Sequence, residues 1–186
     1  HTRYWRDWSS DVCSSDLNMK GVALMQTTKS MPGLKWFWWL PLFFLIDQIS
    51  KWLVLKNISY GETVALFPSL QLTLAHNHGI AFSMLSTQQT FGQIALISFI
   101  VLICAAIGVW LVKTPMEEKW SGFYLALILG GALGNLCDRI WHGYVVDFID
   151  FYVQSWHWYT FNIADAFITI GALMSIKTVL FAPEKT

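Results

Sequence analysis

The sequence predicts an all-α membrane protein with four transmembrane helices and a small β-rich or amphipathic element outside the bilayer. Of its 186 residues, 55% are hydrophobic and only 13% are charged, whereas a soluble domain usually has about 25% charged residues. Four apolar stretches are each close to the ~20 residues that a helix needs to cross a bilayer. The chain also has 11 tryptophans, many at the ends of these stretches, where membrane interfaces enrich this residue.

The four expected spans differ in how many charges they contain. The second has no Asp, Glu, Lys or Arg, whereas the first contains Asp47 and Lys51 and the fourth contains Asp165 near its start. The spans cover Trp36–Leu55, Phe91–Val112, Trp120–Cys137 and about Phe161–Phe181.

The first residues have a different composition. His1–Leu17 is polar and rich in Ser and Asp, with no apolar core of a signal peptide. We therefore expect residues 1–24 to be a foreign-looking, disordered leader, with Met25 as the favoured natural start. Residues 25–186 are expected to form a single four-span membrane domain.

The lysines predict the orientation of the spans. They concentrate at both ends of the chain and around the short 113–119 connector, whereas the 56–90 and 140–160 connectors contain only Lys56. The positive-inside rule then puts both termini in the cytoplasm and the two long connectors on the outer side, which is periplasmic in a bacterial inner membrane. Within these connectors, Ser69–Ala75 alternates like a strand and Tyr144–Val153 is aromatic and β-branched.

Charged residues interrupt the first span. Asp47 and Lys51 are four residues apart, so they share a helix face with the acid in the favourable N-terminal position. Charges inside a bilayer cost on the order of 3 kcal/mol or more each, so they face a bundle interior and are functional candidates. A structural ion pair and a direct chemical role both remain open for these two residues.

A second polar group ends the third span. Asn135, Asp138 and Arg139 share one helix face. Arg139 is permanently charged and adjacent to Asp138, so we expect it to keep Asp138 ionised. An acid fixed as its anion is a poor proton shuttle, so Asp138 and Arg139 are interpreted as scaffold or substrate-positioning residues.

Two further carboxylates are candidates for catalysis. Asp147 lies among apolar residues of the second long connector, and Asp165 lies in the first turn of the fourth span, three residues after Asn162. The directions of the spans bring both to the same outer interface. Two carboxyl groups close together in an apolar pocket share one proton, so one can activate water while the other donates a proton. This pattern predicts an aspartyl-protease dyad at a membrane surface.

Other classes of function fit the sequence less well. No serine lies in a GxSxG motif, and the histidines form no HExxH motif, so neither a metal nor any other cofactor is expected. The 12 basic residues equal the 12 acidic ones, which argues against nucleic-acid binding. A small proton-coupled carrier is the alternative, because intramembrane charges also mark ion relays. A non-enzymatic lipid-binding assembly factor is a third class, and it would need neither carboxylate pair.

Five segments together resemble the lipoprotein signal peptidases (signal peptidase II), which are bacterial inner-membrane aspartyl proteases. The resemblance extends over about Leu34–Leu180 in the family's order. The segments are DQxxK at 47–51, NHGIAF at 77–82, GGALGNLCDR at 130–139, VVDFIDF at 145–151 and FNIAD at 161–165.

The resemblance implies that Asp147 and Asp165 are the catalytic residues. It further implies a substrate-binding or supporting set made up of Asp47, Lys51, Asn77, Gly79, Asn135, Asp138, Arg139 and Asn162. The implied substrate is a diacylglyceryl-modified prolipoprotein, cleaved just before its lipidated cysteine. Such a substrate keeps its acyl chains among the membrane lipids and its scissile bond at the outer interface.

Overall fold

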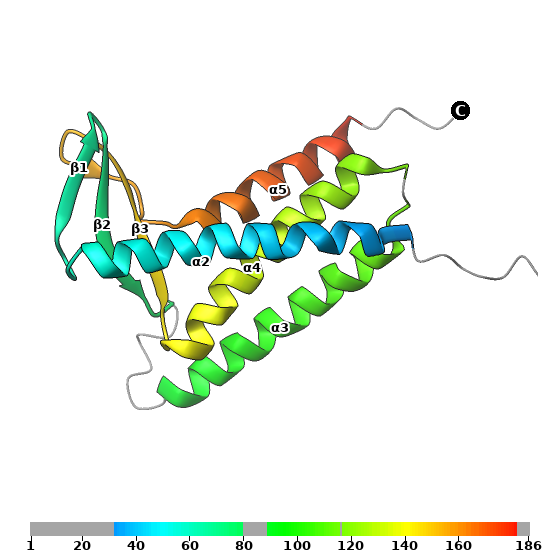
Figure 1. Cartoon of the computed structure of the whole chain (residues 1–186), viewed down its shortest axis with the longest axis horizontal. Helices are drawn as coiled ribbons and strands as arrows, with labels where there is room; N and C mark the ends of the chain where they lie inside the picture. Colours follow the sequence, from blue (N-terminus) through cyan, green and yellow to red (C-terminus); the bar gives the residue numbers. More distant parts are fainter. Residues whose placement is uncertain (1–31, 80–88, 116, 182–186) are drawn as a thin grey trace, which may run out of the picture. The chain divides into compact units, whose positions relative to one another are not determined.

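The computed structural model describes residues 32–79, 89–115 and 117–181. The expected leader and its start methionine lie outside these residues, as do the last three residues of the NHGIAF motif. The described helices are the 3-10 helix η1 (Pro32–Trp38) and the α-helices α2 (Trp39–Asn57), α3 (Gln89–Lys113), α4 (Lys119–Trp141) and α5 (Ile163–Leu180). Figure 1 shows α2, α3 and α5 running alongside α4.

Helix α4 is the most buried element of the bundle, and its glycines explain why. A Cβ atom added to Gly130 would collide with Phe43 of α2, and one added to Gly131 would collide with the Ala164 carbonyl at the start of α5. At Gly134 the added atom would collide with the Asp47 carboxyl group. These small residues therefore allow close helix packing, and they bring α2 and α5 against α4.

Three of the described helices are long and apolar enough to cross a membrane, namely Gly33–Asn57, Phe91–Lys113 and Lys119–Trp141. The third continues beyond the expected end at Cys137, so Asp138 and Arg139 are part of the helix. Helix α5 corresponds to the fourth expected span and packs along α4, but it is not among these three.

An antiparallel sheet lies at one end of the bundle (Figure 1), in agreement with the small β-rich element expected beside the helices. Its strands are β1 (Thr63–Phe67), β2 (Leu70–Asn77), β3 (Val145–Val153) and β4 (Trp156–His157), in that order. The two segments with strand patterns became β2 and β3, which confirms those predictions. The sequence patterns did not predict β1, whose five residues are all exposed, or β4, which has only two residues.

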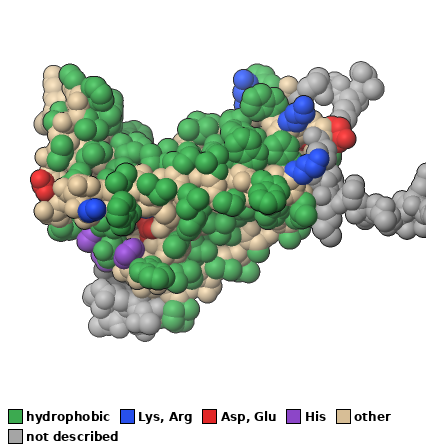
Figure 2. Space-filling model, viewed as in Figure 1, with side chains coloured by type: hydrophobic (Ala, Val, Ile, Leu, Met, Phe, Trp, Pro, Cys, Tyr) green, Lys and Arg blue, Asp and Glu red, His purple; other side chains and the backbone are tan. Residues whose placement is uncertain are grey.

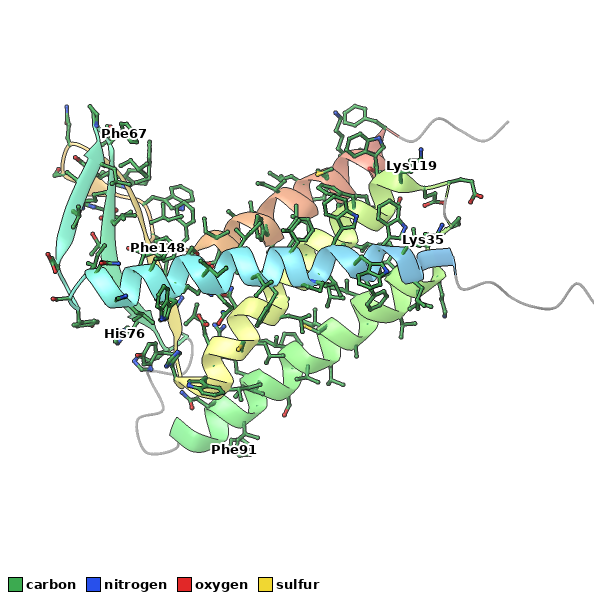
Figure 3. The ribbon with its side chains drawn as sticks, viewed as in Figure 1. Lys35, Phe67, His76, Phe91, Lys119 and Phe148 are labelled. Atoms are coloured by element: carbon green, nitrogen blue, oxygen red, sulfur yellow. The ribbon has the colours of Figure 1, made fainter. Side chains whose placement is uncertain are left out.

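An apolar cluster attaches the sheet to the bundle. It joins Val54 and Ile58, at the end of α2 and just after it, to Leu74 of β2 and Val146 and Phe148 of β3. Phe148 lies at the junction of the sheet and the helices in Figure 3. This packing fixes β3, and therefore the acidic residue between Val146 and Phe148, against the helix ends.

The two ends of the bundle differ in charge. Lys35 and Lys119 lie at the end away from the sheet, whereas Phe67, His76 and Phe148 lie at the sheet end (Figure 3). Hydrophobic side chains cover most of the helices' visible face between them (Figure 2). Such an apolar band is what a membrane-embedded bundle presents to lipid.

Candidate active site

Polar side chains from five segments meet where the sheet joins the bundle. Asp147 comes from β3 and Asp165 from the first turn of α5, and we refer to these two residues as the carboxyl pair. Asparagines from β2, from α4 and from the residue before α5 surround them. Asp147 is buried, with 1% of its surface exposed, whereas Asp165 is only partly buried.

Asp147 accepts hydrogen bonds from amides on both of its oxygens. Asn77 Nδ2 donates to Oδ2 at 2.9 Å and Asn162 Nδ2 donates to Oδ1 at 2.6 Å. The Asn77 oxygen accepts from the backbone N–H of Gly79 at 2.9 Å, which fixes the amide so that its NH₂ group faces Asp147. Gly79 has a φ of 82°, a conformation that favours glycine, and this explains its place in the motif.

Asp165 forms part of the N-terminal cap of α5. Its backbone N–H donates to Asn162 Oδ1 at 2.9 Å, and its carboxyl group accepts from the Asn162 backbone N–H, completing a capping box. Asn135 Nδ2 donates to Asp165 Oδ1 at 2.8 Å, and Asn162 Nδ2 donates to Asn135 Oδ1 at 3.1 Å. The two amides therefore connect Asp165 to Asp147 through a continuous set of hydrogen bonds.

Burial controls the ionisation of Asp147. The pKa of Asp147 is raised from 3.8 to about 6: loss of hydration and the charge of Asp165 raise it, while the hydrogen bonds from Asn77 and Asn162 and the charge of Lys51 oppose the rise. We expected the carboxyl pair to lie in an apolar pocket. Its flanks are indeed the buried Val146 and Phe148, but the carboxyl oxygens face amides.

A second group of charges lies within the bundle, and we call Asp47, Gln48, Lys51 and Asp138 the ion-pair cluster. Lys51 Nζ lies 2.8 Å from Asp47 Oδ2 and 2.8 Å from Asp138 Oδ2. Gln48 Nε2 donates to Asp138 Oδ1 at 2.9 Å. The expected Asp47–Lys51 ion pair is present, and Asp47 also accepts from the backbone N–H of Ala164 at 2.9 Å, which ties α2 to α5.

The prediction that Arg139 is the charged partner of Asp138 was wrong. Asp138 pairs with Lys51, while Arg139 donates from Nη1 to the Asn135 carbonyl at 3.2 Å. Neighbouring helix residues project about 100° apart, so adjacency in sequence does not bring their side chains together. The Arg139 charge interacts more strongly with Asp165, and next with Asp147, than with Asp138. Arg139 therefore belongs to the surroundings of the carboxyl pair.

The histidines do not form a metal site in the part of the chain that the structure describes, where no group of three or more His, Cys, Asp or Glu residues could hold a metal ion. His76 instead stacks on Tyr144 with ring centroids 3.9 Å apart, and His157 pairs with Asp150 across β3 and β4. Sequence reasoning gave no role to Gln48, which bridges α2 and α4. Its position directly after Asp47 in a polar interruption of the span was the available signal.

The fold and the carboxyl pair together define a membrane enzyme. Two solved structures, each described as a bacterial membrane enzyme, align with TM-scores of 0.72 and 0.67 at 26% identity. The alignments cover 80% and 82% of this chain and 94% and 93% of the solved chains.

The family follows from the sequence comparisons. Residues 40–181 match the model of the signal peptidase (SPase) II family. The lipoprotein signal peptidase of Klebsiella aerogenes is 46% identical over 77% of this chain and 87% of the relative. That of Salmonella typhi is 45% identical over 83% of this chain and 92% of the relative. The chain belongs to the signal peptidase II family.

Proposed function

We propose that this chain is an aspartic endopeptidase that removes signal peptides from prolipoproteins, with Asp147 and Asp165 as its catalytic residues. The observation that carries the residue assignment is the carboxyl pair itself. Two acids from different elements are linked at the bundle end through the hydrogen bonds of Asn162 and Asn135. Membership of the signal peptidase II family supports the reaction class.

The chemistry follows from the environments of the two acids. Asp147 keeps the shared proton, because burial and the charge of Asp165 raise its pKa to about 6. Asp165 is the more exposed acid and takes a proton from water, whose oxygen attacks the scissile carbonyl carbon. Asp147 donates its proton to the carbonyl oxygen. When the tetrahedral intermediate collapses, the amide nitrogen receives the proton held by Asp165, the C–N bond breaks, and one hydroxyl of the intermediate returns its proton to Asp147 as the new carbonyl forms.

The substrate is a prolipoprotein that carries a diacylglyceryl group on its cysteine, and cleavage occurs immediately before that residue. Acyl chains stay in the bilayer beside the apolar helices, so they hold the scissile bond at the level of the carboxyl pair. The aromatic residues Phe151, Trp156 and Trp158 are exposed on the sheet, where they are suited to contact the interface.

The membrane arrangement completes the proposal. Four helices cross a bacterial inner membrane, with α5 as the fourth span and both termini in the cytoplasm. The lysines at the bundle end away from the sheet support this orientation, which leaves the carboxyl pair near the periplasmic face (Figure 3). The carrier alternative has no support from the relatives or from the solved structures.

A cleavage assay with matched substrates tests the proposal. The purified chain is incubated in lipid vesicles with a diacylglyceryl-modified precursor and with the same precursor unmodified, and the products are identified by mass spectrometry. We expect one cut before the lipidated cysteine and little cleavage of the unmodified precursor. Equal cleavage of both would contradict the substrate assignment, and full activity of Asp147→Asn or Asp165→Asn would contradict the catalytic one.

A further inference from the structure

Lys51 makes one more contact than an ion pair requires. Its side chain is buried, with 2% of the residue exposed. An ammonium group has three N–H donors and no acceptor. Two donors face Asp47 and Asp138, and the third faces Asn135 Oδ1 at 2.9 Å. Asn135, the partner in this third contact, also donates to Asp165 of the carboxyl pair.

The Asn135 amide has a donor end and an acceptor end, and its surroundings decide which end faces Asp165. Its oxygen accepts from Lys51 Nζ and from Asn162 Nδ2, while its NH₂ group donates to Asp165 Oδ1. If the amide turned over, its NH₂ group would face the ammonium group and its oxygen would face the Asp165 carboxylate. Both contacts would then be repulsive.

Asn162 cannot turn over to compensate. Its oxygen accepts from the backbone N–H of Asp165, so its NH₂ group must point towards Asp147 and Asn135. Two donors therefore converge on the Asn135 oxygen, and only Lys51 supplies a charged one. The Lys51 charge makes the wrong orientation of Asn135 far less favourable than a neutral neighbour would.

We propose that Lys51 is a positioning residue for the reaction: through Asn135 it ensures that an N–H donor, and not a carbonyl oxygen, faces Asp165. This inference rests on the proposed function, because it treats Asp165 as the group that accepts a proton from water. A donor held against a carboxylate favours its ionised form. Lys51 thereby keeps the base in contact with an N–H donor.

A positioning role and a purely structural role of Lys51 predict different effects on the pH profile of the folded protein. A counter-ion for Asp47 and Asp138 affects how much protein folds, but not the pH profile of the folded molecules. The Lys51 charge also lowers the pKa of Asp147 directly through space, an effect that moves the basic limb of the profile and does not need Asn135. The route through Asn135 is isolated by making the same Lys51 substitution with and without the Asn135 side chain.

A double-mutant cycle separates these routes. Four proteins are compared in vesicles with the lipidated precursor: the parent, Lys51→Met, Asn135→Ala and the double variant. We expect Lys51→Met to lower kcat per folded molecule by about tenfold to a hundredfold and to move the acid limb up by about 0.5–1 pH unit. In the Asn135→Ala background the same change should have less than about a twofold effect on kcat.

Gln48→Leu is the matched control, because Gln48 donates to Asp47, Asp138 and the Gly134 carbonyl. It loosens the ion-pair cluster and leaves the Lys51–Asn135 hydrogen bond intact, so it should lower thermal stability without moving the acid limb. If Lys51→Met does not fold, the neutral triple variant Asp47→Asn, Lys51→Met, Asp138→Asn replaces it, since no unpaired charge remains in the bundle.

The outcomes are distinct. A folded Lys51→Met protein with the parent's acid limb, or one with an equal effect in both backgrounds, would overturn the role of Lys51. The proposed function would still stand in that case, because the parent would cleave the lipidated precursor. Failure of the parent to cleave would instead count against the function itself.

Discussion

The ion-pair cluster and the carboxyl pair each contain two carboxyl groups, and they lie only one asparagine apart. In the cluster, Lys51 lies 2.8 Å from both Asp47 and Asp138. In the carboxyl pair, the described hydrogen-bond donors to Asp147 and Asp165 are amide and backbone N–H groups. Neutral amide donors orient a carboxyl group and favour its anion only modestly, whereas an ammonium group at ion-pair distance favours it strongly. The same residue type is therefore structural in one place and suited to proton transfer in the other.

The largest expected effect comes from the carboxyl pair. Asp147→Asn and Asp165→Asn each remove a proton donor or acceptor while keeping shape, so each should lower turnover by about 10² to 10⁴-fold. Thermal stability should stay close to the parent's, because an asparagine oxygen at 165 still accepts the capping hydrogen bond. Turnover is measured at equal folded concentration. If either variant kept most of its rate, the carboxyl pair would not be catalytic and would not differ in role from the ion-pair cluster.

A change in the ion-pair cluster should affect stability first. Asp138→Asn removes one of the two charges that face Lys51, and hydrogen bonds to charged groups contribute about 1.5–3 kcal/mol. We expect the melting temperature to fall, while turnover per folded molecule falls by less than about 10²-fold. Thermal unfolding and turnover are measured on the same preparation. A stable but inactive Asp138→Asn would mean that Asp138, and not Asp147, is the partner of Asp165.

Removal of one amide should shift the pH profile. The Asn77 hydrogen bond lowers the pKa of Asp147, which is nevertheless raised from 3.8 to about 6. Asn77→Ala removes a donor that favours the anion, so Asp147 should hold its proton to higher pH. The basic limb of kcat/KM should then move up by on the order of one pH unit relative to the parent. A downward shift would show that Asp147 does not carry the catalytic proton.

The smallest effect is expected from metal removal. Carboxyl groups that activate water directly need no metal ion, so chelators should leave the rate unchanged. The parent is assayed with and without a chelator, and with zinc added back. If activity were lost and zinc restored it, the result would indicate a catalytic metal bound by the histidines around Tyr144.

Local sequence patterns predicted structure and contacts within a single helix or strand. They did not predict contacts between elements that are far apart in the sequence. The four-residue spacing of Asp47 and Lys51 predicted their ion pair, alternation predicted β2, and aromatic and β-branched composition predicted β3. The Lys51–Asp138 contact joins two helices, and only the packing of α2 on Gly134 brings these residues together. The motif resemblance supplied Asn77 and Asn135, but not the orientation of their amides, which depends on donors from Gly79 and Lys51.

The capping box at the start of α5 gives the protein an internal spectroscopic probe. The backbone N–H of Asn162 donates to Asp165 Oδ2 at 3.3 Å, so its proton experiences the charge of that carboxyl group. Asn162 has 0% of its surface exposed, so solvent exchange should be slow. With ¹⁵N-labelled protein, the chemical shift of this single amide resonance should follow the protonation of Asp165 as the pH is changed. Inhibitors that alter this protonation could then be ranked by nuclear magnetic resonance without a substrate.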